Sequence, residues 1–250
     1  MLTDIHCHLE SVPFDRLNTF IAQNGRIGAV SMTEESAQQL IQLKLQYLDN
    51  IYLFLGIHPE KDCDEVMIQT VIDLIYSHRD LLSGIGEIGI PFFYLDDKTE
   101  PEKHLIKQQG SVLLERFIKI AAELSLPVNL HVVEEDIHYA LPILQRYKIK
   151  GALFHWYEGS DENLDLLHQQ GHFISVSPWI FVEPHYFEFA KKIPLDMLLV
   201  ESDSPCKYNG KVGEPMMIHD VVAALAAHHQ LAVAQLQQII ETNTRRYLQL

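Results

Sequence analysis

The chain has 250 residues, of which 47% are hydrophobic and 21% charged, an ordinary composition for a globular protein of one large core. No signal-peptide pattern opens the sequence and no apolar run approaches 18 residues, so we expect a soluble, cytoplasmic protein without a membrane span. The formal charge of −15, from 19 basic and 34 acidic residues, argues against a surface that holds long duplex nucleic acid through many phosphates.

Cys7, Cys63 and Cys206 are widely spaced and form no C-x-x-C pair, so we interpret them as reduced thiols. No linker, charge block or repeat interrupts the chain, and residues 1–250 are expected to form a single domain. Nothing in the sequence indicates an obligatory protein partner.

Short apolar runs alternate with amphipathic segments, which is typical of βα units and a parallel sheet. The expected strands are residues 2–6, 27–32, 51–56, 81–86, 127–131, 151–155, 172–176 and 197–200. The expected helices are 13–23, 34–47, 64–76, a segment around 113–124 that follows a long polar loop, 137–147, 161–169, 183–192, 215–228 and a last one around 236–243. Eight such units predict an α/β fold of the (β/α)₈ TIM barrel type, with functional groups at the carboxyl ends of the strands.

His6 and His8 stand at the end of the first strand. Alternation along a strand puts both imidazoles on one face, about 7 Å apart, where they can chelate one divalent ion. Taken alone, such a pair is more often two surface histidines. The interpretation therefore depends on where other ligand-type residues fall.

Further ligand-type residues follow other strands. His58 follows the third strand, Glu87 the fourth, His131 the fifth, His155 the sixth and Asp203 the eighth. Each alone has an ordinary explanation, such as a hydrogen-bonded structural histidine, a turn residue or a cap. Because independent accidents would not bring the whole set to one mouth of a barrel, we predict a metal site there.

Imidazole combined with carboxylate suits Zn²⁺, Mn²⁺, Co²⁺ or Fe²⁺, whereas Mg²⁺ prefers mainly oxygen ligands. Four histidines and two carboxylates exceed the three protein ligands of a typical catalytic zinc. We therefore expect two divalent ions, Mg²⁺, Mn²⁺ or Zn²⁺, about 3.5–4 Å apart, which can share a hydroxide and clamp both oxygens of a displacement.

With these residues assembled, the chain resembles the TatD-type metal-dependent deoxyribonucleases, a branch of the amidohydrolase superfamily. The resemblance runs nearly end to end and consists of eight blocks in family order. They are Asp4 with His6, His8 and Leu9; Gly56-Ile57-His58-Pro59; Gly86-Glu87-Ile88-Gly89; Leu126-Pro127 through His131; Ser177-Pro178; Glu201-Ser202-Asp203-Ser204-Pro205; Gly210-Lys211 through Glu214-Pro215; and Asn243-Thr244-Arg245-Arg246.

The resemblance implies that the ligands are divided between two ions. It also implies that a metal-bound water is the nucleophile. One ion is held by His6, His8 and Asp203, the second by His131 and His155, and Glu87 bridges them. Asp203 is then the general base. Glu201 shares its face if the strand stays extended, and either supports the acid-base chemistry and the ligands or hydrogen-bonds a neighbouring loop. His58 is expected to bind substrate phosphate.

Three segments depart from the family pattern and bear on the substrate. The usual Ser-Arg after His131 is Val132-Val133, so a phosphate-binding guanidinium is missing, and the usual Asp-Tyr-Tyr is Pro91-Phe92-Phe93. Trp156-Tyr157 replaces Cys-Phe; these rings either stack on a base or pack beneath the loop, and packing is favoured. The remaining candidates to hold phosphate are Lys207, Lys211, Arg245 and Arg246, of which the two arginines are expected to cap or pack the final helix.

The sequence leaves three functions open. The first is a metal-dependent nuclease that trims DNA ends or single-stranded DNA, which the ligand set and the family blocks favour. The second is a metal hydrolase of a small ester, amide or lactone, favoured by the missing arginine and the acidic composition. The third is a barrel without catalysis that serves as a binding subunit, which the full ligand set disfavours.

Overall fold

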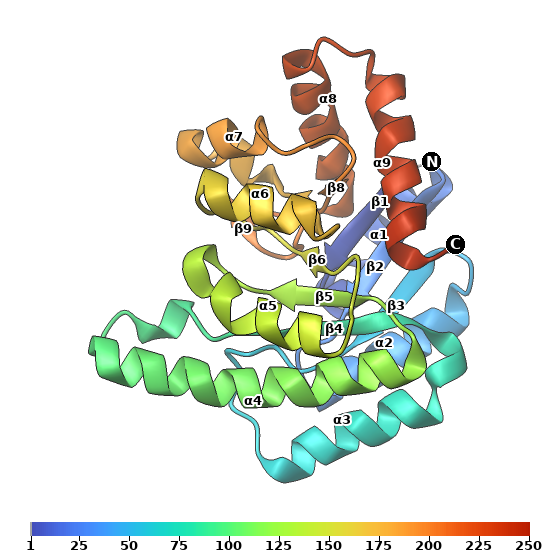
Figure 1. Cartoon of the computed structure of the whole chain (residues 1–250). Helices are drawn as coiled ribbons and strands as arrows, with labels where there is room; N and C mark the ends of the chain where they lie inside the picture. Colours follow the sequence, from blue (N-terminus) through green and yellow to red (C-terminus); the bar gives the residue numbers. More distant parts are fainter. Residues whose placement is uncertain (1) are drawn as a thin grey trace.

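The structure is a computed structural model that describes residues 2–250. Its main sheet holds eight parallel strands in chain order, and each pairs with the next, as expected for a (β/α)₈ barrel (Figure 1). The strands are β1 (Leu2–Cys7), β2 (Gly25–Val30), β3 (Ile51–Leu55), β4 (Leu82–Gly89), β5 (Val128–His131), β6 (Leu153–Phe154), β7 (Phe173–Val176) and β8 (Leu198–Val200). The predicted fold class is confirmed.

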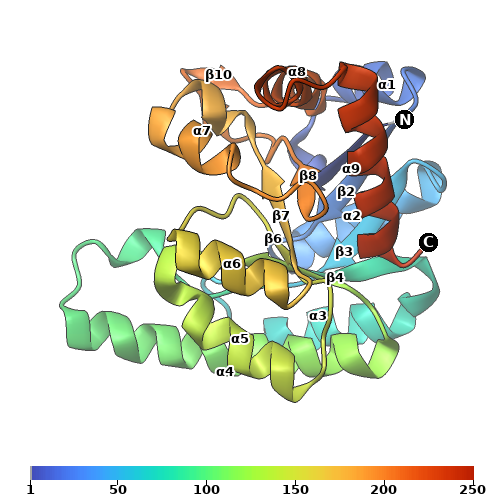
Figure 2. The same ribbon diagram turned by 45° about the horizontal axis from the view of Figure 1, so that its top comes forward.

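The helices lie outside the strands (Figures 1 and 2). They are α1 (Phe14–Ala22), α2 (Glu34–Gln46), α3 (Glu65–Ser77), α4 (Glu100–Leu124), α5 (Ile137–Arg146), α6 (Asp161–Gln169), α7 (Pro184–Ala190), α8 (Ile218–His228) and α9 (Val233–Leu248). Figure 1 shows the N-terminal half of α4 reaching past the carboxyl end of β5, on the side to which the strands point. In the part of the chain that the structure describes, no helix combines the length and the apolar character needed to cross a membrane.

The barrel closes between β1 and the segment that follows β8. Within residues 2–250 no strand ladder joins β8 to β1. Instead, the buried Asp4 carboxylate accepts hydrogen bonds from the backbone N–H and the hydroxyl of Ser202, at 2.8 and 2.6 Å, and Asp203 N–H donates to His6 O at 3.0 Å. This seam places the end of β1 directly beside Asp203.

Apolar side chains fill the barrel interior towards its amino-terminal end. Ile5, Phe54 and Leu199 form a buried cluster with Tyr247 of α9, whose hydroxyl donates to Val128 O at 3.1 Å. The larger apolar cluster lies between the strands and the helices. Because Tyr247 and Leu248 at the end of α9 cover this end of the barrel, an open site is left to the carboxyl ends of the strands.

Several expected boundaries were wrong. The fourth strand continues to Gly89, so Glu87 lies inside it, and the segment expected to be a long polar loop is the first half of the 25-residue α4. That half lacks an apolar stripe because it projects past the barrel, where Leu105 is exposed. The helix expected from residue 215 begins with a 3₁₀ turn and is α-helical from Ile218. A short hairpin, β9 (Lys207–Tyr208) and β10 (Lys211–Val212), was not expected, although the Asn209-Gly210 pair between them is a hairpin signal.

Candidate metal centre

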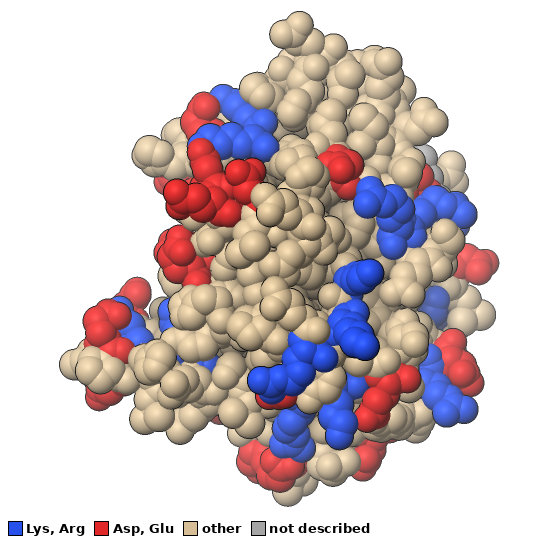
Figure 3. Space-filling model, in the orientation of Figure 1, with Lys and Arg blue, Asp and Glu red and all other residues tan. Residues whose placement is uncertain are grey.

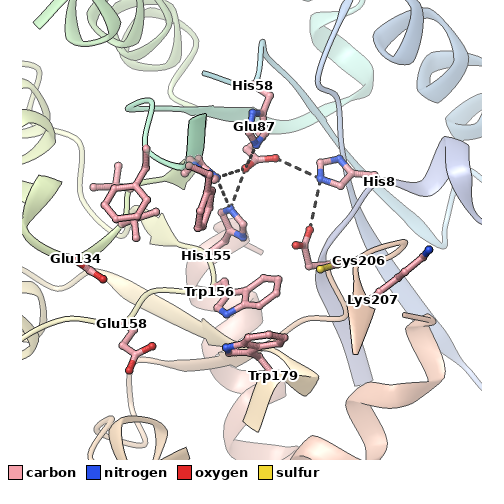
Figure 4. Close-up of a pocket in the computed structure, with 16 residues that line it drawn as sticks. His8, His58, Glu87, Glu134, His155, Trp156, Glu158, Trp179, Cys206 and Lys207 are labelled. Carbon is pink, nitrogen blue, oxygen red and sulfur yellow. Dashed lines mark hydrogen bonds and ion pairs between the residues drawn. The ribbon is translucent and has the colours of Figure 1, made fainter. Parts of the chain in front are cut away.

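Glu87 is the centre of a buried cluster of imidazoles. Its Oε1 lies 2.9 Å from His131 Nδ1 and 2.9 Å from His155 Nε2. Its Oε2 lies 3.4 Å from His6 Nε2 and 3.5 Å from His8 Nε2. Figure 4 shows His8, which follows β1, and His155, which follows β6, converging on the carboxylate. A third imidazole, His58, also approaches Oε1, at 3.3 Å from its Nε2. Both oxygens of Glu87 therefore face ring nitrogens, the arrangement of a carboxylate able to bridge two cations.

Asp203 completes one side of the cluster. Its Oδ1 lies 3.4 Å from His6 Nε2 and 3.5 Å from His8 Nε2. Three groups of potential ligands have their donor atoms within 4.8 Å of one another. They are His6, His8 and Asp203; His6, Glu87 and His155; and His58, Glu87 and His131. The first group is one of the two ligand groups that the family resemblance implies. The other two groups separate His155 from His131, which were expected to hold one ion together, and the last group also contains His58.

A buried asparagine fixes the tautomer of His6. Asn129 Nδ2 donates to Ile5 O at 3.3 Å, which orients the amide so that Oδ1 accepts from His6 Nδ1 at 2.9 Å. The lone pair of His6 is therefore on Nε2, which faces the carboxylates. Within residues 2–250, no hydrogen-bond partner reaches His6 Nε2 or Glu87 Oε2, although both atoms are buried. Unsatisfied buried groups of this kind are rare in a folded protein, and a cation between them would satisfy both.

Glu201 lies behind His155. Its Oε1 is 3.4 Å from His155 Nδ1 and its Oε2 accepts from the Ser175 hydroxyl, so the other nitrogen of His155 points at Glu87. Glu201 is fully buried and does not line the pocket. The backbone is not extended to Asp203, whose φ is +43°, so the two carboxylates do not share one exposed face as the sequence suggested. The geometry gives Glu201 the role of orienting an imidazole, not of touching a substrate.

Glu60 holds His131 and a loop of the rim. Its Oε1 lies 3.6 Å from His131 Nε2 and accepts the backbone N–H groups of Phe92 and Phe93 at 2.9 and 2.6 Å. Burial raises the pKa of Glu60, but its hydrogen bonds with His131 and with these two backbone groups outweigh it and lower the pKa to about 2. Sequence reasoning missed this residue. Its one signal was its place two residues after His58.

His58 is oriented as a donor towards the cluster. The backbone N–H of Glu60 donates to His58 Nδ1 at 3.1 Å, so in the neutral ring the proton lies on Nε2, 3.3 Å from Glu87 Oε1. A protonated Nε2 cannot bind a cation but can donate to an anionic oxygen. This tautomer fits the expected contact with a substrate phosphate better than a ligand role.

The charges of the cluster compensate one another. Burial alone would raise the pKa of Glu87, but the neighbouring imidazoles His58, His155 and His6 hold it well below its usual value. Burial likewise opposes protonation of His131, yet Glu60 and Glu87 raise the pKa of His131 to about 9. Since a divalent cation must displace protons from these nitrogens, its binding should release protons near neutral pH.

The comparisons with known proteins agree with the geometry. A family model described as TatD related DNase matches residues 3–249. The chain belongs to the TatD family. It is 31% identical to an uncharacterized metal-dependent hydrolase of Haemophilus influenzae, with both chains covered in full. It is 27% identical to human deoxyribonuclease TATDN3, over 100% of this chain and 94% of that one.

A solved structure confirms the architecture of this TatD protein. The TatD homolog YJJV from Escherichia coli superposes with a TM-score of 0.85 at 23% identity, over 100% of this chain and 98% of that one. The resemblance inferred from the sequence blocks is confirmed. With its homologues described as metal-dependent hydrolases, the chain is a metal-dependent hydrolase of the TatD family.

A pocket of about 560 Å³ opens above the cluster of this TatD hydrolase. Besides His8, His58, Glu87, His131, His155 and Asp203, it is lined by Phe92, Phe93, Val132, Val133, Glu134, Trp156, Glu158, Trp179, Cys206 and Lys207. Lys207 is the one lysine or arginine among these lining residues. Where the family pattern has an arginine, Val133 lines the wall. On the face in Figure 3, most Lys and Arg side chains lie on the right half and at the lower centre, and smaller groups lie at the upper left and at the left edge.

The other sequence candidates lie elsewhere. Arg246 donates to Asp196 O at 2.9 Å and stacks over Phe173 at the amino-terminal end of the barrel, so it packs the last turn of α9. Lys211 lies on β10, outside the pocket. Tyr157 is buried beneath the loop, where its hydroxyl donates to Glu134 O at 3.0 Å, whereas its neighbour Trp156 is half-buried and lines the pocket.

Proposed function

We propose that this TatD protein is a metal-dependent phosphodiesterase that removes nucleotides from an end of single-stranded DNA. The observation that carries the proposal is the Glu87 carboxylate, whose two oxygens face imidazole nitrogens of different histidines, His6 and His8 on one side and His131 and His155 on the other. The name deoxyribonuclease of the human relative supports the choice of substrate. A two-metal centre suits this chemistry because it can stabilise both the attacking and the leaving oxygen of a phosphodiester.

The donor set favours two divalent ions with affinity for nitrogen, such as Zn²⁺ or Mn²⁺, over Mg²⁺. The expected holders are His6, His8 and Asp203 for one ion, His131 and His155 for the other, and Glu87 for both. Bound ions supply an acidified water molecule and polarise the ester oxygens.

The protein groups have separate tasks in the reaction. Asp203 Oδ1 faces His6 and His8, which leaves Oδ2 to accept a proton from water as general base. His58 Nε2–H donates to a phosphate oxygen, and Lys207 at the rim pairs with the charge of the phosphate. Glu201 and Glu60 keep His155 and His131 in the required orientation.

The test is release of mononucleotides from end-labelled single-stranded oligonucleotides with Mn²⁺, Mg²⁺ or Zn²⁺. Asp203→Asn should lower release at least a hundredfold, because it removes the base and weakens one metal site. Asp165→Asn, an exposed position on α6, is the matched control and should behave as wild type. A circular strand without ends should resist cleavage. If a metal-loaded protein releases no nucleotide with any of these ions, the nuclease proposal is wrong.

A second candidate is hydrolysis of a small ester, amide or lactone. The apolar wall at Val132 and Val133 and the carboxylates of Glu134 and Glu158 favour it, because they offer little to an extended polyanion. A competition assay between nucleotides and a small ester distinguishes the two candidates. Nucleotides should inhibit turnover of a small p-nitrophenyl ester if both occupy the same nuclease site, and should leave it unchanged if the physiological substrate is not a nucleotide.

A further inference from the structure

Both tryptophans of the chain lie in the wall of the pocket. Trp156 follows β6 and Trp179 follows β7, and their ring centroids are 5.7 Å apart. Tyr208 of β9 backs them, with its ring 5.8 Å from Trp156 and 6.4 Å from Trp179. Figure 4 shows the two indoles next to each other beside His155. Three chain segments thus build one aromatic wall next to the metal cluster.

The backbone presents Trp156 to the pocket. In an extended chain, the residue after His155 would point to the opposite face. Trp156 instead has a φ of +42°, uncommon for a bulky residue, and lines the same pocket as His155. Such conformations persist where the surroundings impose them and gather at ligand sites. Tyr157, buried and hydrogen-bonded to Glu134 O, anchors the loop from behind.

The rest of the rim suits one flat ring better than an extended polyanion. Phe93 is 62% exposed on another part of the rim, and its ring lies 5.8 Å from that of His131. Lys207 is the single lysine or arginine of the lining, whereas Glu134 and Glu158 add two carboxylates to those of the cluster. A strand crossing this rim would place phosphates near carboxylates, whereas one terminal nucleotide can keep its phosphate at the cluster and its base on the aromatic wall.

We propose that Trp156 and Trp179 form a stacking subsite for a single aromatic base. This inference rests on the proposed phosphodiesterase function and deepens it: the enzyme engages one terminal nucleotide at a time, chiefly through its base and one phosphate. Stacking tolerates any base, so the subsite should show little preference among the four.

Binding of the product-like nucleotide dAMP to the metal-loaded protein tests the subsite without any hydrolysis. Because both tryptophans line the pocket, intrinsic tryptophan fluorescence reports on this site alone. We expect saturable quenching by dAMP and at least tenfold weaker binding of deoxyribose 5-phosphate, which lacks the base. Trp156→Ala, read through Trp179, should weaken dAMP binding roughly tenfold to a hundredfold and leave deoxyribose 5-phosphate binding within about twofold.

Two further variants keep the test falsifiable if Trp156→Ala folds poorly. Trp156→Phe keeps an aromatic face and should retain most of the affinity. Phe181→Ala removes an exposed ring two residues after Trp179 that does not line the pocket, and should bind dAMP as wild type does. Equal affinities for dAMP and deoxyribose 5-phosphate, or an unchanged preference in Trp156→Ala, would overturn the subsite. This readout is independent of nuclease activity, whose absence in the oligonucleotide assay would count against the proposed function alone.

Discussion

Replacing Asn129 with leucine should weaken metal binding without placing any new group in the pocket. Asn129 is fully buried and connects His6 Nδ1 to Ile5 O, so Asn129→Leu keeps the volume and removes the orienting hydrogen bond. Loss of such an outer partner typically costs 10- to 100-fold in metal affinity, or about 1.4–2.8 kcal/mol. The His6 N–H left unsatisfied should also lower the free energy of unfolding by about 1–3 kcal/mol.

Competition with a chelating dye measures the apparent Kd for Zn²⁺ or Mn²⁺, and urea unfolding of the metal-free protein measures stability. Asn243→Leu is the matched control, because Asn243 is also buried and donates to Leu195 O and Leu198 O, at 2.7 and 2.9 Å, away from the cluster. It should lose stability and keep its metal affinity. If Asn129→Leu and Asn243→Leu bind metal within twofold of each other, His6 does not bind through an Nε2 oriented by Asn129.

Two further predictions concern other buried groups. Glu60→Ala should lower metal affinity about tenfold, because it releases His131. It should also speed protease cleavage within residues 91–95, because it releases the backbone N–H groups of Phe92 and Phe93. Unchanged cleavage would contradict the anchoring role of Glu60. Burial lowers the pKa of His172 to about 4, so the folded state binds fewer protons than the unfolded state, and stability is lost as the pH falls below about 6.5. In His172→Asn the side chain should still accept the Ala152 N–H. Between pH 7 and pH 5, the free energy of unfolding measured in urea should fall by about 2 kcal/mol less in this variant than in wild type. If the two proteins lose stability in parallel, His172 is not the source of the pH dependence.

The clustering of these ligand-type residues could be predicted because strand geometry is local. Alternation placed His6 and His8 on one face, and the rule for barrel enzymes placed the residues that follow apolar runs at one mouth. The expected fourth strand ended at residue 86, three residues before the observed end at Gly89, because glycines are poor strand formers. A side chain at Gly86 would lie 2.7 Å from Asn129, so this glycine permits the close approach of β4 and β5 that brings Glu87 to the centre.

The supporting residues could not be predicted because their partners are distant in sequence. Asn129 meets His6 across 123 positions, and Glu60 meets the backbone of Phe92 and Phe93 across more than 30. Such contacts leave no periodic pattern. The inward turn of Trp156 was equally hidden, since it depends on a left-handed backbone at a residue type that rarely adopts one.

The metal cluster and the substrate walls come from different parts of the barrel units. Glu87, His131 and His6 lie in strands β4, β5 and β1, whereas Val133, Trp156 and Trp179 belong to loops that follow strands. Strands hold positions more rigidly than loops, so loop residues can change without displacing the ligands. In this chain the loops lack the arginine of the family pattern and carry an aromatic wall, while the full ligand set is kept. Its choice of substrate therefore depends on a few loop residues, and agreement with the family in metal chemistry does not by itself fix what the enzyme cleaves.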